Sequence, residues 1–361
     1  MIMKVDYILG SLDLPMYGAL RCVKEAYFYN KNKIDIKLIE YEKKGFKLPS
    51  KINYFYDIWF IKKNLRKLAI KHFTSQTTAY ILNFIKPIKT IVTCYDLIPL
   101  YYINEEKNLL KKCMIKFWVN GLKKADRIIA ISEFTKKEII RMLDYPPEKI
   151  FIAYPGVDTS KYKVLKRNEK IAKKYQFDSD FFNIVYVGNE EPRMNIETII
   201  RALAILKKQN KKIRLIKGGN PNSQGRREIL IELIKKLGLE KDVIFTGYID
   251  EKDMPQIYNL ADLSIYPISY TGFGLPPLEA MACGCPVITS NKASLPEVVG
   301  DAAIICDPKN HNEMAEAILK IMSNNKLKKN LIKKGLKQAK KYTWRGYAQQ
   351  TLDCYKSLEK E

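Results

Sequence analysis

The sequence has few of the features that mark a membrane-spanning or secreted protein. No run of apolar residues approaches the roughly 18–20 that a helix needs to cross a bilayer. The N-terminus lacks the charged and apolar regions of a signal peptide. The seven cysteines are an odd number and form no regular framework, which favours a reducing compartment. We therefore expect a cytoplasmic protein.

Metal-binding patterns are equally scarce. The sequence contains only two histidines, His72 and His311. Its D-x-D sequence, Asp178-Ser-Asp180, precedes an apolar segment, whereas ligands of parallel sheets gather where strands end, so we interpret it as a turn. Cys283-Gly-Cys285 has helix-end spacing, and we interpret it as packing. We expect no metal site.

Acidic residues are outnumbered by basic ones, and the formal net charge is +24. Residues 1–170 hold 33 Lys and Arg against 17 Asp and Glu, while the rest of the chain holds 30 against 22. A basic first half points to an anionic partner, either a membrane surface or nucleic acid. A generally lysine-rich surface explains the same numbers. Because no helix-turn-helix, RNA-binding or zinc pattern is present, we expect no nucleic-acid partner.

The segment from Glu105 to Lys124 predicts a basic amphipathic helix. Its apolar residues lie broadly on one side and its lysines lie around them: Leu109, Leu110, Met114, Phe117 and Leu122, with Lys107, Lys111, Lys112, Lys116, Lys123 and Lys124. Such a helix can lie on anionic lipid, which would make the protein peripheral on the cytoplasmic face of a membrane. Packing on its own sheet is the alternative role.

Apolar strands alternate with helical segments along the whole chain, which is long enough for two domains. In the second half the predicted strands cover residues 183–187, 213–217, 243–246, 263–266, 287–289 and 303–305. This alternation is typical of an α/β fold with parallel sheets covered on both faces. We predict two Rossmann-like domains facing across a cleft, residues 1–165 and 166–343, with a polar linker over residues 159–174.

A glycine-rich loop after the strand at 263–266 carries the most specific signal. Gly272 and Gly274 let the backbone approach a ligand closely, and the following prolines suit the start of a helix. Unpaired N–H groups at a helix start attract an anion. We place Glu279 in the first helical turn, within reach of hydroxyl groups beside that anion. Phosphate together with hydroxyls suggests a nucleotide or a sugar nucleotide.

This loop also carries a family resemblance. Gly272-Phe-Gly-Leu-Pro-Pro-Leu-Glu279-Ala-Met-Ala-Cys-Gly, followed by Pro-Val-Ile-Thr-Ser290 and Leu295-Pro-Glu-Val, resembles the signature of the retaining family 4 (group 1) glycosyltransferases of the GT-B fold. The resemblance implies transfer of a hexose from a GDP- or UDP-sugar to a sugar or lipid-linked acceptor, without a metal. It also implies an acceptor-binding first domain, a donor-binding second domain, and a C-terminal helix at 344–361 that packs back on the first domain.

The candidate site combines this resemblance with the loops at strand ends. The expected donor contacts are Gly18, Asn189, Arg193, Tyr248, Thr271, Gly272, Phe273, Gly274, Leu275 and Glu279, and the expected catalytic residues are Arg193, Lys217, Tyr95 and Asp96. Arg193 stands in a motif similar to the family's donor-phosphate motif; the alternative is pairing with Glu190 or Glu191. Lys217 ends a strand and is a candidate phosphate ligand; the alternative is a lysine facing solvent.

Several positions depart from the family pattern. Met194 stands where relatives place a phosphate-binding lysine, Asn189 where some carry arginine, and Thr271 where they carry a first glutamate. Tyr95 replaces a common histidine and offers only a phenol. We expect an active transferase. The alternative is a catalytically idle binding or scaffold protein on the same fold.

Overall fold

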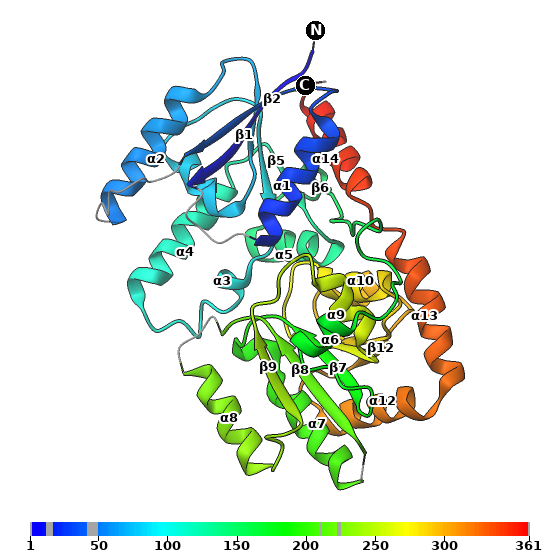
Figure 1. Ribbon diagram of the computed structural model, residues 1–361. Coiled ribbons are helices and arrows are strands. Elements are labelled where there is room, and N and C mark those ends of the chain that lie inside the picture. The colour runs from blue at the N-terminus through cyan, green and yellow to red at the C-terminus, as the bar shows by residue number, and fades with distance from the viewer. Residues whose placement is uncertain (1, 12–16, 42–49, 210, 222–224, 360–361) are drawn as a thin grey trace. The chain divides into compact units, whose positions relative to one another are not determined.

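The computed structural model describes residues 2–11, 17–41, 50–209, 211–221 and 225–359, and it contains two compact units (Figure 1). The first unit comprises Met1–Gly156 and Thr343–Glu361, and the second comprises Val157–Tyr342. Within the described residues, no helix combines the length and the apolar character that crossing a bilayer requires.

The first unit is built on a parallel six-stranded sheet of order β2-β1-β3-β4-β5-β6. Its strands are β1 (Lys4–Ser11), β2 (Asp35–Tyr41), β3 (Ile70–Phe73), β4 (Thr90–Cys94), β5 (Arg127–Ala130) and β6 (Ile150–Ile152). Its helices are α1 (Tyr17–Asn30), α2 (Ser50–Asn64), α3 (Ile98–Tyr101), α4 (Leu109–Leu122), α5 (Glu133–Leu143) and α14 (Trp344–Glu359), with short 3₁₀ helices η1 (Gln76–Asn83) and η2 (Pro147–Lys149). Every residue of β3, β4 and β5 is buried, as expected for strands covered on both faces.

The second unit contains a parallel six-stranded sheet of order β12-β11-β10-β7-β8-β9. Its strands are β7 (Phe182–Val187), β8 (Ile213–Gly218), β9 (Val243–Gly247), β10 (Leu263–Tyr266), β11 (Val287–Ser290) and β12 (Ile304–Cys306). Its helices are α6 (Glu169–Lys174), η3 (Pro192–Met194), α7 (Ile196–Lys208), α8 (Arg226–Lys236), α9 (Met254–Leu260), α10 (Leu275–Ala282), α11 (Leu295–Val299), α12 (His311–Ser323) and α13 (Asn325–Ala339). The predicted pair of Rossmann-like parallel sheets is therefore confirmed.

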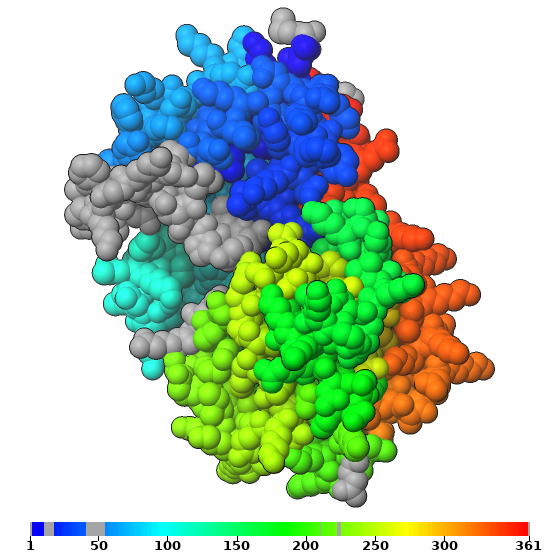
Figure 2. Space-filling model, viewed as in Figure 1, coloured from blue at the N-terminus to red at the C-terminus, as the bar shows by residue number. Residues whose placement is uncertain are grey.

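Helix α14 packs beside α1 although the two lie at opposite ends of the sequence (Figures 1 and 2). The Asn30 side chain donates to the carbonyl oxygen of Ala348 (2.9 Å). The Tyr355 hydroxyl donates to that of Tyr7 (2.9 Å) and also contacts Nδ1 of His72 (2.7 Å). This buried polar network joins the C-terminal helix to the first sheet.

The boundary between the units differs from the prediction. We expected residues 159–174 to be a linker, but the second unit already begins at Val157. In this segment Tyr162 is buried, the Leu165 N–H donates to the Asn259 side chain (2.7 Å), and its last residues form α6. Its polar composition concealed this packing, because the partner residue in α9 is distant in sequence.

The Asp178–Asp180 segment and the start of α4 were also predicted from the sequence. Asp178-Ser-Asp180 is a turn as predicted, since the Asp180 N–H donates to Oδ1 of Asp178 (3.0 Å). The helix expected from Glu105 begins instead at Leu109, where the Asn108 side chain caps it by accepting from the Lys111 N–H (3.1 Å). The start of this helix thus follows its capping residue.

The buried His72 gives the first unit a definite pH dependence. Burial lowers the pKa of His72 to about 3, so its imidazole stays neutral in the folded protein. In the unfolded chain the imidazole takes up a proton below a pH of about 6.5. The unfolded state then binds more protons, and stability is lost as pH falls from about 6.5 toward 3.

We therefore expect the loss of unfolding free energy between about pH 7 and pH 5 to be smaller in His72→Asn than in wild type, by about 2 kcal/mol. Asparagine keeps a polar side chain at this position but does not titrate. Urea unfolding of both proteins at both pH values measures the difference. An identical pH dependence of the two proteins would contradict the expectation.

Candidate functional site

The strand order of the second sheet reverses between β7 and β10, which are neighbours in the sheet. In doubly wound sheets ligands bind beside the carboxyl ends of the strands at such a point. Two loops leave the sheet there: the β7 loop (residues 188–195) and the β10 loop (residues 267–274). Six of the thirteen predicted site residues lie on these two loops, and Leu275 and Glu279 follow in α10.

Hydrogen bonds join the β7 loop to the β10 loop. The Ser269 N–H donates to the carbonyl oxygen of Arg193 (2.9 Å), and Nη1 of Arg193 donates to that of Tyr270 (2.9 Å). The Asn195 side chain donates to the carbonyl oxygen of Pro267 (2.7 Å) and to Oγ of Ser269 (2.8 Å). The two loops are thus fixed relative to each other by several independent bonds.

Arg193 is a largely buried cation at the centre of this junction, with 17% of its side chain exposed. Its Nε donates to Oε2 of Glu191 (2.8 Å). Of the two interpretations of Arg193, the pairing with Glu191 is thus present, and phosphate binding stays a prediction. A guanidinium carries five N–H donors, so the bonds to Glu191 and Tyr270 do not exhaust it.

The end of the β10 loop has a backbone conformation that requires glycine. Gly274 has φ of 109° and precedes the first residue of α10. A Cβ atom there would lie 2.7 Å from Cδ2 of Leu295. The buried Ser294 hydroxyl lies within hydrogen-bonding distance of the carbonyl oxygens of Phe273 (2.6 Å) and Thr271 (3.1 Å). The backbone that leads into α10 is therefore closely constrained.

Glu279 does not lie in the first turn of α10, and this part of the prediction was wrong. The helix begins at Leu275, before the two prolines, so that Glu279 is in its second turn. The residue is buried. Burial, together with the nearby Glu279 carboxylate, raises the pKa of Tyr258 well above its usual value. Glu279 is thus a buried carboxyl group of α10 that lies near Tyr258.

The other predicted donor contacts of the second unit are spread over its loops. The Asn189 side chain accepts from the Glu191 N–H (3.3 Å), and Thr271 shares a side-chain hydrogen bond with Tyr266. Phe273 is buried, and Gly272 lies beside it on the β10 loop. The remaining two contrast in exposure: Tyr248 is exposed after β9, and Leu275 is half-buried.

Lys217 lies in the interior of the second unit and not at its surface. Its side chain is fully buried, and Nζ lies 2.7 Å from Oε1 of Glu190, which is also fully buried. The same Nζ donates to the carbonyl oxygen of Gly219 (2.6 Å). The alternative of a solvent-facing strand-end lysine is therefore wrong, and contact with a ligand stays a prediction.

In the first unit, Tyr95 and Asp96 follow β4 directly. Gln76 holds both: its Oε1 accepts from the Tyr95 N–H (3.0 Å) and its Nε2 donates to the Asp96 carbonyl oxygen (3.2 Å). The Tyr95 hydroxyl donates to the carbonyl oxygen of Ala19 (3.2 Å). Gly18 is exposed near the start of α1, while residues 12–16 of the preceding loop lie outside the described residues.

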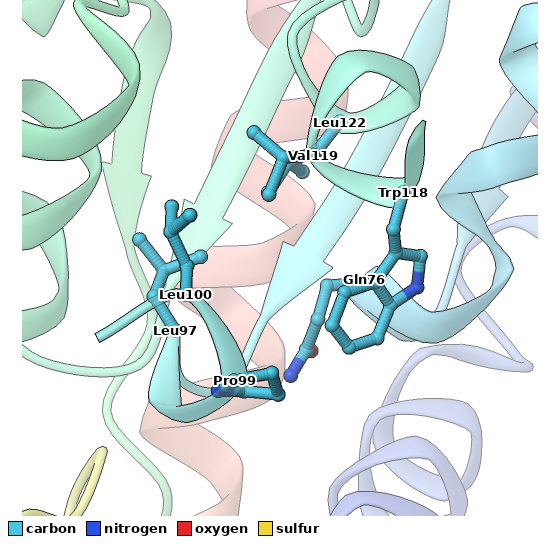
Figure 3. A pocket seen from close by; sticks show the side chains of 7 residues that line it. All are labelled: Gln76, Leu97, Pro99, Leu100, Trp118, Val119 and Leu122. Atoms are coloured by element: carbon cyan, nitrogen blue, oxygen red, sulfur yellow. The ribbon is translucent and has the colours of Figure 1, made fainter. Parts of the chain in front are cut away.

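A small pocket adjoins this strand end (Figure 3). Its lining is apolar except for Gln76 and comes from η1, α3 and α4: Gln76, Leu97, Pro99, Leu100, Trp118, Val119 and Leu122. Because Gln76 also holds Tyr95 and Asp96, the pocket and the end of β4 share one side chain. The pocket is a small, mainly apolar hollow next to Gln76.

Three residues that contact these sites were not predicted. Gln76 and Ser294 bind backbone groups of predicted residues, and Arg227 binds Glu190, the carboxylate partner of Lys217. Glu190 was considered only as a partner of Arg193. A buried lysine in a mainly apolar strand is costly without a compensating partner, and this was a signal for a nearby carboxylate such as Glu190. Nothing in the sequence distinguishes Arg227 from other basic residues.

Two family models match the chain. The model described as "Glycosyltransferase Family 4" matches residues 33–161, and the model described as "Glycosyl transferases group 1" matches residues 167–338. The first match lies in the first unit except for its last five residues (157–161), and the second lies within the second unit. The second match contains both the β7 and the β10 loop.

Two Escherichia coli proteins are similar in sequence. O-antigen chain mannosyltransferase B is 32% identical over 272 residues, which cover 74% of this chain and 68% of that protein. The serotype-specific mannosyltransferase WbdA is 31% identical over 281 residues, which cover 75% of this chain but only 34% of WbdA. The chain thus corresponds to about a third of WbdA.

A solved structure extends the likeness to the whole fold. Anabaena HepE, determined in complex with UDP and glucose, superposes with a TM-score of 0.81 at 18% identity. The superposition covers 98% of this chain and 100% of HepE. At this identity the likeness concerns the fold alone.

Proposed function

Since the chain belongs to the family 4 (group 1) glycosyltransferases, we propose that it transfers a hexose from a GDP- or UDP-linked sugar to a sugar or lipid-linked acceptor, with retention of anomeric configuration. Its fold is GT-B, as predicted from the sequence. The names of the two E. coli relatives favour mannose as the hexose and glycan synthesis as the setting. In this proposal the transfer needs no metal ion.

The observation that carries the proposal is the junction of the β7 and β10 loops at the reversal of strand order. Arg193 and the backbone at Gly274 suit the diphosphate, because both offer N–H donors to an anion. Glu279 suits the ribose, because a carboxylate accepts hydrogen bonds from hydroxyl groups. Thr271, Gly272, Phe273 and Leu275 surround the donor, joined by Asn189 and Tyr248 from neighbouring loops.

The proposed chemistry is a single exchange at the anomeric carbon of the donor sugar. The acceptor oxygen forms a bond to this carbon on the face from which the diphosphate leaves, and the carbon–oxygen bond to the phosphate breaks. The acceptor proton passes to a phosphate oxygen of the donor. The protein positions the reactants and stabilises the growing negative charge of the diphosphate, mainly through Arg193.

Tyr95 and Asp96 are the proposed catalytic residues of the first unit, and Gly18 is its proposed donor contact. Burial, with a smaller contribution from the neighbouring Tyr347, raises the pKa of Tyr95 well above its usual value. Its phenol is therefore protonated at neutral pH and acts as a hydrogen-bond donor rather than as a base. Asp96 accepts from the Ile98 N–H (3.1 Å), which orients its carboxylate at the end of β4.

One observation favours the alternative of a catalytically idle binding protein. Met194 is buried in the core of the second unit, so its side chain supplies neither charge nor contact to a phosphate. Assays of sugar transfer and of donor hydrolysis with common sugar nucleotides distinguish the two functions. Binding of a nucleotide sugar without either reaction would support the idle protein.

We expect Glu279→Gln to weaken nucleotide binding by about 1.5–3 kcal/mol, because the amide keeps the size but loses the charge of the acceptor. Calorimetric titration with UDP and GDP measures the change. Glu313→Gln is a matched control, since Glu313 accepts from the Asp307 N–H (2.9 Å) elsewhere in the same unit. Equal nucleotide affinity of wild type and Glu279→Gln would remove Glu279 from the site.

Arg193→Ala should reduce kcat by about 10²–10³ and change donor KM much less, because the diphosphate charge grows in the transition state. Steady-state kinetics of sugar transfer measure both constants. Arg214→Ala is a suitable control, since Arg214 is a similarly buried arginine paired with Asp178 (3.6 Å). Equal losses in kcat and in donor affinity would mean that Arg193 does not stabilise the transition state more strongly than it binds the donor in the ground state.

The proposal extends to an anionic membrane surface as a partner of the first unit. Leu109 and Leu110 at the start of α4 are 75% and 77% exposed, and Met114 and Phe117 follow as exposed apolar residues. Exposed lysines accompany them along and beside the helix: Lys107, Lys111, Lys116, Lys123 and Lys124. Apolar side chains with flanking cations suit insertion at an anionic lipid surface. The protein would then be peripheral on the cytoplasmic face.

Replacing both leucines (Leu109→Ser/Leu110→Ser) should weaken binding to vesicles of phosphatidylglycerol and phosphatidylcholine by at least about tenfold, since each buried leucine contributes about 1.5–3 kcal/mol. Sedimentation with vesicles measures the binding, which should also fall as salt rises. Leu68→Ser is the control, because Leu68 is 83% exposed but lies outside α4. Vesicle binding that does not change with salt, with anionic lipid or with the leucine substitutions would contradict the membrane proposal. The basic charge would then be a general property of the protein surface.

A further inference from the structure

Glu190 is a buried carboxylate that two cations hold in place. It lies on the β7 loop, three residues before Arg193. Lys217 reaches it from the end of β8, and Arg227 reaches it from the first turn of α8. Nε of Arg227 lies 3.0 and 2.9 Å from the two carboxylate oxygens, and its Nη2 makes a further short contact. We call these three residues the Glu190 cluster.

The position of Lys217 in the sheet explains why it faces inward. In β8 it pairs with Tyr186 of β7 and Phe245 of β9, so strands flank it on both sides. An uncompensated ammonium in such a place is costly, and its carboxylate partner removes most of this cost. The bonds from Lys217 to Glu190 and to the Gly219 carbonyl oxygen direct its Nζ into the protein.

The charges of the Glu190 cluster do not cancel. Burial alone would raise the pKa of Glu190, but the hydrogen bonds from Arg227 and Lys217 hold it below its usual value. Glu190 is therefore ionised at neutral pH. Burial lowers the pKa of Lys217, and the hydrogen bond and charge of Glu190 oppose this effect. With both basic side chains protonated, the cluster carries one positive charge more than its carboxylate neutralises.

The cluster and the β10 loop hold opposite ends of the β7 loop. At one end, Glu190 is bonded to Lys217 and Arg227, and Arg226 donates to its carbonyl oxygen (3.1 Å). At the other end, Asn195 is bonded to Pro267 and Ser269. Arg193 lies between these anchors. Only residues 191 and 192 separate Glu190 from Arg193, so the anchored carboxylate and the guanidinium belong to one short segment of backbone.

We propose that Lys217 and Arg227 are positioning residues, which act through Glu190 to fix the β7 loop and with it Arg193. This inference rests on the proposed role of Arg193 at the donor diphosphate. It assigns Lys217 an indirect role in place of the phosphate contact expected from the sequence. The surplus charge of the cluster adds a positive field beneath the loop.

Lys217→Met suits the test because it leaves Glu190 paired with Arg227, so no buried charge is left without a partner. Arg227→Met is a second variant, which leaves Glu190 paired with Lys217 in case the first does not fold. Lys174→Met is the control. It removes a lysine paired with Asp253 (2.7 Å) in the same unit, away from the β7 loop.

The kinetic test is a double-mutant cycle of Lys217→Met with Arg193→Ala. A displaced guanidinium should lower kcat by about 10–100-fold in Lys217→Met, with little change in donor KM. In the Arg193→Ala background the same substitution should change kcat by less than about twofold, because the residue it acts through is gone. Multiplying effects would overturn the proposal and assign Lys217 to direct donor contact.

Hydrogen exchange in the ligand-free protein gives a second readout that does not depend on activity. Amides of residues 189–191 and 193–195 should lose protection in Lys217→Met and in Arg227→Met but not in Lys174→Met. Unchanged protection and kcat together with a lowered thermal midpoint would mean that Lys217 only stabilises the fold, and this would overturn the proposal. If the wild type transfers no sugar, the proposed function fails, and the exchange result alone decides whether the cluster fixes the loop.

Discussion

The reversal of strand order between β7 and β10 is the constraint on which the rest of the donor site depends. On either side of these strands the chain crosses to opposite edges of the sheet, so the β7 and β10 loops meet with no strand between them. Their backbones are bonded together, as in the Ser269–Arg193 hydrogen bond. Arg193 and Glu279 therefore reach one region from elements that are distant in sequence.

Much of this fold could be predicted from the sequence, because buried parallel strands are continuous apolar runs. The predicted segments at residues 213–217, 243–246 and 263–266 coincide with β8, β9 and β10 to within one residue. Other boundaries depended on interactions with distant residues. Residues 159–174 were assigned to a linker by composition, whereas the Leu165–Asn259 hydrogen bond attaches them to α9. Glu279 was placed in the wrong turn because α10 starts before its prolines.

The part of the candidate site that consists of a local sequence motif could be predicted. The part that depends on pairing between buried charges could not. The β10 loop was recognised from its two glycines and the motif that follows them. The structure adds a physical reason for Gly274, which has a positive φ and leaves no room for a Cβ atom beside Leu295. The Glu190 cluster joins three segments that are separate in the sequence. Its members are charged, whereas the residues expected to be buried in a parallel sheet are apolar. Pairing of this kind becomes visible only when the strands are assembled.

The Glu190 cluster bears on the departures from the family pattern. Asn189 and Met194 carry no positive charge, and Met194 is committed to the core. Lys217 and Arg227 share one carboxylate, so the unit retains a cation in excess within the same region. Inside a protein the effective dielectric constant is well below that of water, so a charge there acts over a longer distance than a solvated one. In our proposal, Lys217 and Arg227 thus partly replace the positive charge that Asn189 and Met194 do not supply. Arg193 remains the side chain that contacts the donor diphosphate directly.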